Sequence, residues 1–247
     1  MSLNLKIASF ALAALFLSGC AVQTSSSMFS DPIQKENILK LAGNYEQLIT
    51  DYKKRLANDD NPKDRLKLAQ LYYEIKDYNS AKYFLEPLVK KIANQDNLLL
   101  YSKILEELGE YQEALDSINE ALSLNPQNPE AWNLKGIIFA SNGYIKEAQK
   151  SFLIAKDLFY DDCVINTNLG ALEILQNNYR GAISYFEPIY ARGCENTFLL
   201  HNYTFALIKL NEYTAAENLI EKYNLAKYPK KLIADLIKAK PNDFKDE

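Results

Sequence analysis

The sequence predicts an all-α protein with about five stacked helix–turn–helix repeats, an N-terminal helix and a C-terminal capping helix. Three observations lead to this fold class. The 247 residues include 8 glycines but 17 tyrosines, which favours helices over a turn-rich sheet. A tyrosine stands three residues before an alanine at Tyr78, Tyr111, Tyr179 and Tyr213, in segments that recur along the chain. Five alanines recur every 33 or 34 residues, and such a fixed period indicates a repeat array. They are Ala81, Ala114, Ala148, Ala182 and Ala216.

Residues 1–19 are predicted to form a secretory signal peptide. Lys6 is their only charged residue, and residues 7–17 are apolar except for Ser9. This run is too short to cross a bilayer, and its pattern is typical of an export signal. An exported protein resides where disulfides persist.

The signal ends in Leu-Ser-Gly-Cys, which resembles the lipobox cut by signal peptidase II in bacterial lipoproteins. The resemblance implies that Cys20 is lipidated and becomes the mature N-terminus. The alternative is an ordinary signal that happens to end in cysteine. By the same resemblance, Ala21 after the cysteine favours the outer membrane, with the protein facing the periplasm. Residues 20–33 are predicted to be the lipidated cysteine and a flexible tether.

Residues 34–61 are predicted to be helical, with residues 34–57 forming one long stretch. Tyr45 lies 33 residues before Tyr78, which matches the period of the repeats. The segment is therefore interpreted either as an N-terminal cap or as a degenerate sixth repeat.

Five repeats are predicted over residues 62–230, starting at residues 62, 95, 129, 163 and 197. Each contains a helix A, a short turn and a helix B, because turn-forming residues recur in its middle. Position eight is always small, at Ala69, Ser102, Gly136, Gly170 and Thr204. Position twenty-four is always large and apolar, at Leu85, Ile118, Phe152, Phe186 and Ile220. Small residues let two helices approach closely, so positions eight and twenty predict the contact between helices A and B.

These repeats resemble the tetratricopeptide repeat. The best copy is residues 129–162, which matches the family pattern at Trp132, Gly136, Phe139, Ala148, Phe152 and Ala155. Lys135 and Glu173 depart from the pattern, because the family has large apolar residues there. The resemblance implies a right-handed superhelix with a concave groove lined by the A helices, a surface that binds protein partners.

Residues 231–247 are predicted to form a capping helix and a tail. A stack needs a terminal helix to cover its last repeat. The apolar face of that helix consists of Leu232, Ile233, Leu236 and Ile237. Pro87 and Pro188 fall inside B helices, and both helices are expected to bend or end early because proline removes a hydrogen bond.

Cys163 and Cys194 occupy positions one and thirty-two of the fourth repeat. The start of helix A and the end of helix B lie at the same end of an antiparallel hairpin. Adjacent helix axes are about 8–10 Å apart, whereas a disulfide needs Cα atoms within about 7 Å. Loop ends can cover this gap. We predict a disulfide between the two cysteines, the alternative being two free buried thiols.

The sequence contains no pattern typical of an enzyme or of a metal or cofactor site. It lacks GxSxG, HExxH, CxxC and a glycine-rich phosphate loop, and its single histidine is His201. The net charge of −4 argues against nucleic-acid binding. Without residues 1–19, 27 basic and 32 acidic residues leave −5. We therefore expect membrane contact through the lipid anchor only.

The predicted groove has a charged half and an apolar half. By resemblance, the inner positions of the first two repeats include Lys63, Gln70, Glu74, Asp96, Lys103, Glu106 and Glu107. Those of the later repeats include Ile137, Val164, Ala171, Ile174, Leu175, Phe198, His201, Phe205 and Ile208. We expect the apolar half to bind an apolar or amphipathic segment of a partner. The alternative is that the capping helix covers part of it.

Residues 166–189, NTNLGALEILQNNYRGAISYFEPI, are similar to the TadD lipoproteins of the tight-adherence (Flp) pilus. That family, like the related type IV pilus pilotins, is thought to help assemble or localise an outer-membrane secretin. The resemblance implies a non-enzymatic scaffold with a secretin or another pilus or secretion component as its partner. Two alternatives have the same format: the lipoprotein of outer-membrane β-barrel assembly, and adaptors for envelope proteases or peptidoglycan hydrolases.

Overall fold

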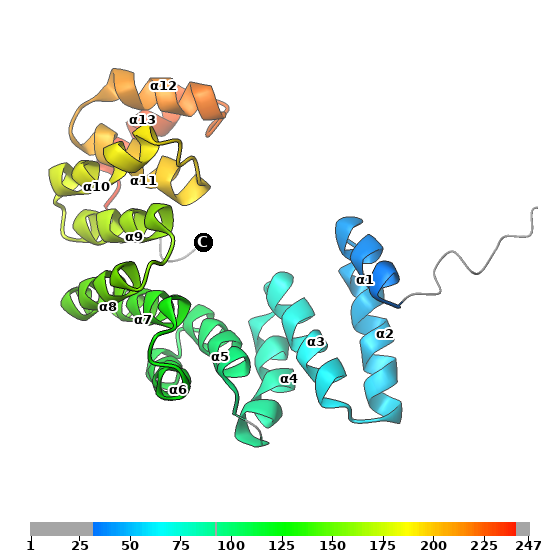
Figure 1. Cartoon of the computed structure of the whole chain (residues 1–247). Coiled ribbons are helices and arrows are strands. Elements are labelled where there is room, and N and C mark those ends of the chain that lie inside the picture. The colour runs from blue at the N-terminus through cyan, green and yellow to red at the C-terminus, as the bar shows by residue number, and fades with distance from the viewer. Residues whose placement is uncertain (1–31, 92, 241–247) are drawn as a thin grey trace, which may run out of the picture. The chain divides into compact units, whose positions relative to one another are not determined.

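The computed structural model describes residues 32–91 and 93–240. The predicted signal peptide, the lipidated Cys20, most of the tether and the tail from residue 241 lie outside the described residues. Within the described part every regular element is an α-helix (Figure 1). The chain divides into two units, residues 1–44 and 45–247.

The described part of the first unit contains α1, Pro32–Leu41. The second unit begins with α2, Tyr45–Asn58. The single long helix expected here is therefore wrong. Gly43 has a φ of 68°, a left-handed conformation that glycine adopts readily. The N–H groups of Gly43 and Asn44 donate to Lys40 and Leu39, which closes the end of α1.

Ten helices of the second unit form the five predicted hairpins, which follow one another side by side in chain order (Figure 1). Their bounds are α3 Pro62–Glu74, α4 Tyr78–Lys91, α5 Gln95–Glu107, α6 Tyr111–Leu124, α7 Pro129–Ser141, α8 Ile145–Asp157, α9 Asp162–Leu175, α10 Tyr179–Ala191, α11 Thr197–Lys209 and α12 Tyr213–Tyr223. Tyr78, Tyr111, Tyr179 and Tyr213 are each the first residue of a B helix.

Each A helix begins at a capping side chain. The residue before the helix accepts a hydrogen bond from a backbone N–H of the first turn, which satisfies a donor that has no partner inside the helix. The five capping residues are Asn61, Asn94, Asn128, Asp161 and Asn196. These caps define where each repeat starts.

The turn between helices A and B closes in the same way in every repeat. One residue adopts a left-handed backbone conformation, and the N–H of the next residue bonds back to the last turn of helix A. The left-handed residues are Lys76, Gly109, Gly143, Asn177 and Asn211. They all fall within the turns predicted from the sequence.

The hairpin core pairs a small residue on helix A with a large one on helix B. A Cβ atom added to Gly136 would overlap the ring of Phe152, and one added to Gly170 would overlap the ring of Phe186. The repeats with a larger residue at position eight carry leucine or isoleucine at position twenty-four. The two positions therefore compensate in volume, as a close-packed interior requires.

Pro87 and Pro188 do not end their helices early, so that part of the expectation is wrong. Helices α4 and α10 continue to Lys91 and Ala191. Both prolines are exposed. The carbonyls that lose an N–H partner belong to Tyr83 and Ser184, which also lie on exposed sides of their helices, so that water can satisfy them.

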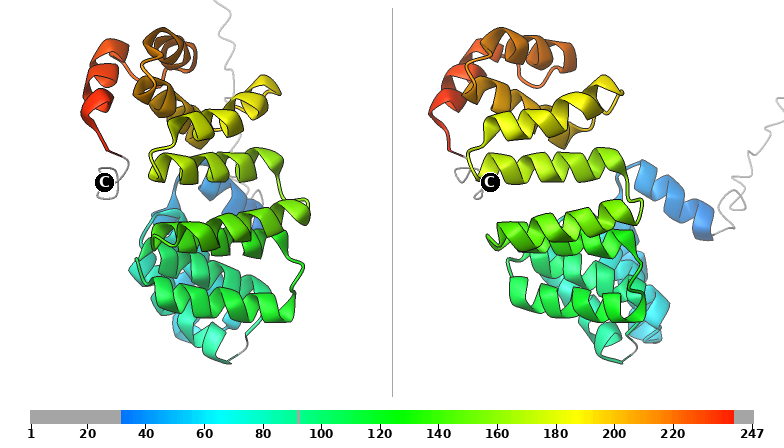
Figure 2. Two further views of the ribbon diagram at one scale, coloured as in Figure 1. Left: turned by 90° about the vertical axis from the view of Figure 1, so that its left-hand side faces the viewer. Right: turned by 60° about the vertical axis from the view of Figure 1, so that its left-hand side comes forward.

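The last helix, α13 (Pro229–Lys238), packs against α11 and α12 at the end of the stack (Figure 2). Ile233 is buried, and Leu232 and Leu236 pack on the core of the last hairpin. Three of the four residues of the predicted apolar face therefore face the core, whereas Ile237 is 45% exposed.

Candidate partner-binding pocket

An apolar pocket lies between α9, α11 and α13. Its volume is about 570 Å³, within the range of roughly 300–1,000 Å³ that is usual for ligand sites. Five residues predicted for the apolar half of the groove line it: Ala171, Ile174, Leu175, His201 and Phe205. Five further residues complete the lining: Asn202, Thr204, Leu225, Leu232 and Leu236. We refer to this site as the terminal pocket.

The other four predicted groove residues lie outside the terminal pocket. Ile137 and Val164 are half-buried on their A helices. Ile208 is only 1% exposed and belongs to the same core cluster as Ile233 of α13. Phe198 is 77% exposed near the start of α11. The groove is therefore not continuously apolar. Its apolar lining is concentrated where α13 adds a third wall.

Phe205 is fixed within the wall of the terminal pocket. It is 7% exposed, and its ring meets that of Tyr179 edge-on, with 6.0 Å between centroids. Lys209 Nζ lies 5.3 Å from the Phe205 ring centroid. The same ammonium donates hydrogen bonds to the carbonyls of Ile237 and Ala239. Lys209 therefore holds the end of α13 beside this wall.

One polar group of the terminal pocket has no partner. Thr204 is 2% exposed, and among the described residues its Oγ1 takes part in no hydrogen bond. Leaving a buried hydroxyl unpaired costs on the order of 1–3 kcal/mol. A ligand that combines apolar surface with a hydrogen-bonding group would satisfy both features of the lining.

The charged half of the groove is paired internally. Lys103 Nζ lies 2.7 Å from Glu130 Oε1, and the Ser141 hydroxyl donates to Glu106 Oε1 at 2.6 Å. Burial, and to a smaller extent the nearby Glu107, raises the pKa of the Glu106 carboxyl. Lys103 and Glu106, two of the charges that the sequence places here, are therefore engaged with the third repeat.

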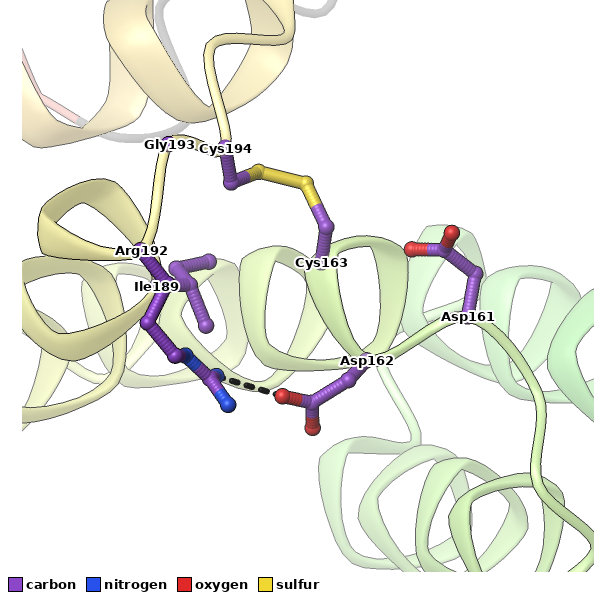
Figure 3. Close-up of a pocket in the computed structure, with 7 residues that line it drawn as sticks. All are labelled: Asp161, Asp162, Cys163, Ile189, Arg192, Gly193 and Cys194. Carbon is purple, nitrogen blue, oxygen red and sulfur yellow. Dashed lines mark hydrogen bonds and ion pairs between the residues drawn. A yellow bond between two sulfur atoms is a disulfide. The ribbon is translucent and has the colours of Figure 1, made fainter.

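The structure joins Cys163 and Cys194 in a disulfide, with their Cα atoms 6.0 Å apart (Figure 3). The bond links the start of α9 to the loop after α10. Asn196 Nδ2 lies 3.0 Å from Cys163 Sγ, while Asn196 Oδ1 accepts from the Leu199 N–H as the cap of α11. The disulfide thus joins the two ends of the fourth repeat, and Asn196 connects it to the first turn of the fifth.

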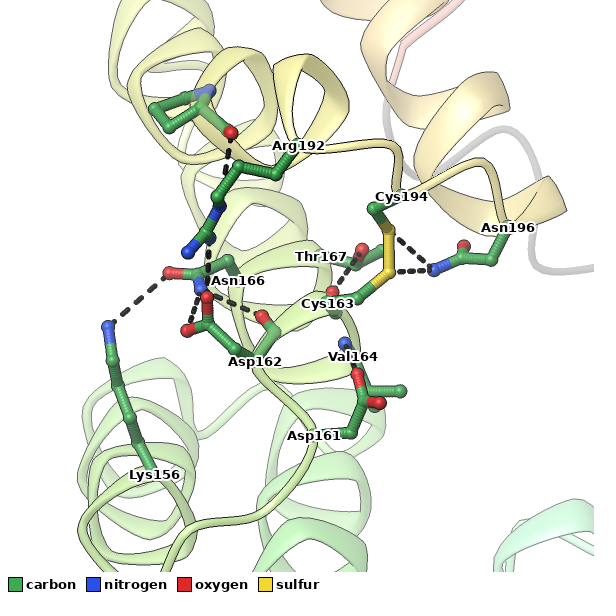
Figure 4. A network of polar contacts seen from close by, with 11 residues as sticks. Lys156, Asp161, Asp162, Cys163, Val164, Asn166, Thr167, Arg192, Cys194 and Asn196 are labelled. Carbon is green, nitrogen blue, oxygen red and sulfur yellow. Dashed lines mark hydrogen bonds and ion pairs between the residues drawn. A yellow bond between two sulfur atoms is a disulfide. The ribbon is translucent and has the colours of Figure 1, made fainter.

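An ion pair supports the same junction. Arg192 donates to Asp162, whose carboxylate also accepts from Asn166 Nδ2 (Figure 4). Burial raises the pKa of Asp162, but the two hydrogen bonds and the positive charge together outweigh it and place this pKa below its ordinary value. The pair is therefore intact at neutral pH. The stability that it contributes is lost only as the pH falls through the lowered pKa.

Within the described residues, no group of three histidine, cysteine or acidic side chains is placed to hold a metal ion. No helix in residues 32–91 or 93–240 combines the length and apolar character needed to cross a membrane.

Comparisons with known proteins identify the repeat. A tetratricopeptide-repeat family model matches residues 103–143, and the model for subunit 3 of the anaphase-promoting complex (cyclosome) matches residues 42–121. The TPR repeat-containing protein YpiA of Bacillus subtilis is 27% identical over 125 residues. This match covers 50% of the chain but 30% of YpiA.

Solved structures show the same fold. A tetratricopeptide repeat protein of Parabacteroides merdae has a TM-score of 0.71 at 18% identity, covering 82% of this chain and 80% of that one. Pseudomonas aeruginosa pilF has a TM-score of 0.58 at 19% identity, with coverages of 78% and 87%. YrrB, described as having an unusual peptide-binding site, has a TM-score of 0.53 at 21% identity, with coverages of 67% and 86%.

The predicted all-α superhelix of tetratricopeptide repeats is confirmed. The chain has the fold of tetratricopeptide-repeat proteins, and the repeat model itself matches residues 103–143.

Proposed function

We propose that the chain is a lipid-anchored scaffold of the bacterial outer membrane, and that its terminal pocket holds an apolar or amphipathic segment of a protein partner. The observation that carries this proposal is the concentration of apolar lining between α9, α11 and α13. Binding there removes apolar surface from water on both partners, at about 25 cal/mol per Å².

The internal pairing of the charged half favours the terminal pocket over the rest of the groove. A partner that used Lys103 or Glu106 would first have to break the contacts with Glu130 and Ser141. Exchanging one charged contact for another yields little net free energy at a solvated surface. The apolar walls of the terminal pocket are alanine, isoleucine, leucine and phenylalanine side chains, so a partner has no ion pair to break there.

The proposed client is the secretin of a tight-adherence pilus. The lipobox before Cys20, the number of repeats and the similarity of residues 166–189 to the TadD lipoproteins support this assignment. An anchor at Cys20 would keep the pocket close to the membrane into which a secretin inserts.

A Cys20→Ala variant tests the anchor and the client together. The variant lacks the thiol that would carry the lipid, so we expect it to remain a precursor or a soluble periplasmic protein. The secretin should then fractionate less with the outer membrane. Membrane flotation followed by immunoblotting of both proteins measures these two results.

Ser25→Ala, in the same predicted tether, is the matched control and should behave as the wild type. Outer-membrane flotation of Cys20→Ala at the wild-type level would refute the anchor. Normal secretin localisation with a correctly displaced Cys20→Ala protein would instead refute the secretin as client, and would favour β-barrel assembly or an envelope-enzyme adaptor.

A further inference from the structure

The described chain ends at the rim of the terminal pocket. Helix α13 supplies two of the pocket's walls, Leu232 and Leu236, and it ends at Lys238. Lys209 binds the carbonyls of Ile237 and Ala239 while lying over the ring of Phe205, another wall residue. Ala239, near the end of the described residues, therefore lies beside the pocket wall.

The composition of the segment that follows the described residues complements the lining of the pocket. Residues 241–247 read PNDFKDE, in which Phe244 is the only large apolar side chain among polar and charged residues. Phe244 is five positions beyond Ala239, and an extended chain of that length spans at most about 17 Å. Phe244 can therefore reach the pocket. The short connection gives it an effective concentration on the order of millimolar.

We propose that residues 241–247 fold back and insert Phe244 into the terminal pocket of the same chain. The docked segment is a built-in competitor for the pocket. With respect to the client, this inference rests on the proposed function: a client segment binds by displacing Phe244. The intramolecular docking itself requires no client.

Photo-cross-linking in the purified full-length protein tests the docking. A photoreactive phenylalanine analogue replaces Phe244, and the adducts are mapped by mass spectrometry. We expect intramolecular adducts on the walls of the pocket, such as Leu175, Phe205 and Leu232. The same analogue at the exposed Tyr83, in α4 of the first repeat, should not label these residues.

Hydrogen–deuterium exchange provides a second readout without a bulky label. Phe244→Ala should lower the ratio of docked to free segment about tenfold or more, because the phenyl ring supplies most of the apolar area. Amides of α9, α11 and α13 around the pocket should then exchange faster, whereas Lys245→Ala should leave them unchanged.

Three outcomes would overturn the proposal: adducts between two copies of the chain, adducts away from the pocket, or identical exchange in Phe244→Ala and the wild type. None of them bears on client capture, which is measured separately with the pocket variant Leu175→Glu. Failure of the tail proposal is thus distinguishable from failure of the proposed function.

Discussion

Phe186→Ala is expected to lower the free energy of unfolding by about 3–5 kcal/mol, the usual cost of truncating a buried phenylalanine. Phe186 is fully buried, and its ring lies against Gly170 of the same hairpin. Gly170 has no side chain that could fill the space that the ring leaves. Chemical denaturation followed by circular dichroism measures the loss. A midpoint within error of the wild type would contradict the assigned packing.

A double variant provides the matched control for this packing. Ala69 and Leu85 occupy the two equivalent positions of the first repeat, so Gly170→Ala combined with Phe186→Leu copies an arrangement that the chain already uses. Each single substitution should destabilise the protein. Gly170→Ala adds a Cβ that overlaps the Phe186 ring, and Phe186→Leu leaves a void. The double variant should be more stable than the sum of the singles by about 0.5–3 kcal/mol. Additive effects would mean that the two side chains do not compensate.

Loss of the disulfide is the second large effect. Replacing both Cys163 and Cys194 by serine should lower the free energy of unfolding by about 3–4 kcal/mol, because the bond closes a loop with a sequence separation of 31. The wild type with reductant should approach the double variant, while reductant should not affect the double variant itself. Denaturation curves with and without reductant make this comparison.

Alkylation followed by intact mass measurement establishes whether the bond exists in the cell. The unreduced periplasmic protein should take up no label at Cys163 and Cys194. Two alkylated residues at these positions before reduction would contradict the bond.

The period of the repeats was predictable because each hairpin needs the same contact at the same place. Position twenty must be alanine where the helices cross, and all five alanines are completely buried. The compensation between positions eight and twenty-four is also visible in the sequence, since the two glycines accompany the two phenylalanines. The asparagine and aspartate caps are visible too, but a single cap residue is not distinctive until the helix start is known.

The terminal pocket was only partly predictable. Helical periodicity places Ala171 and Phe205 on the inner face, but it does not say how the capping helix sits. Leu225, Leu232 and Leu236 come from beyond the last repeat, so their contribution depends on tertiary packing. Single residues that depart from the repeat pattern were equally hard to interpret from the sequence.

Glu173 illustrates such a departure, because it stands where the family pattern expects an apolar residue. In the structure it accepts a hydrogen bond from Asn178 Nδ2 at 2.6 Å across the turn between α9 and α10. The side chain therefore has a local structural role that periodicity alone does not reveal.

The central claim is that the terminal pocket, rather than the charged half of the groove, holds the client. Leu175→Glu is a suitable test because Leu175 lines the pocket but is half-buried, whereas the more buried Phe205 would endanger the fold. Lys103→Glu, in the charged half of the groove, is the matched variant, because it also introduces a glutamate. Both must retain the wild-type circular dichroism spectrum and melting curve before they are compared.

Co-purification of the secretin from solubilised envelopes is the decisive measurement. We expect Leu175→Glu to reduce secretin capture at least about tenfold, since a hot-spot contact contributes roughly 2 kcal/mol or more, and Lys103→Glu to capture it at nearly the wild-type level. Capture that is retained by Leu175→Glu and abolished by Lys103→Glu would contradict the account and assign the client to the charged half.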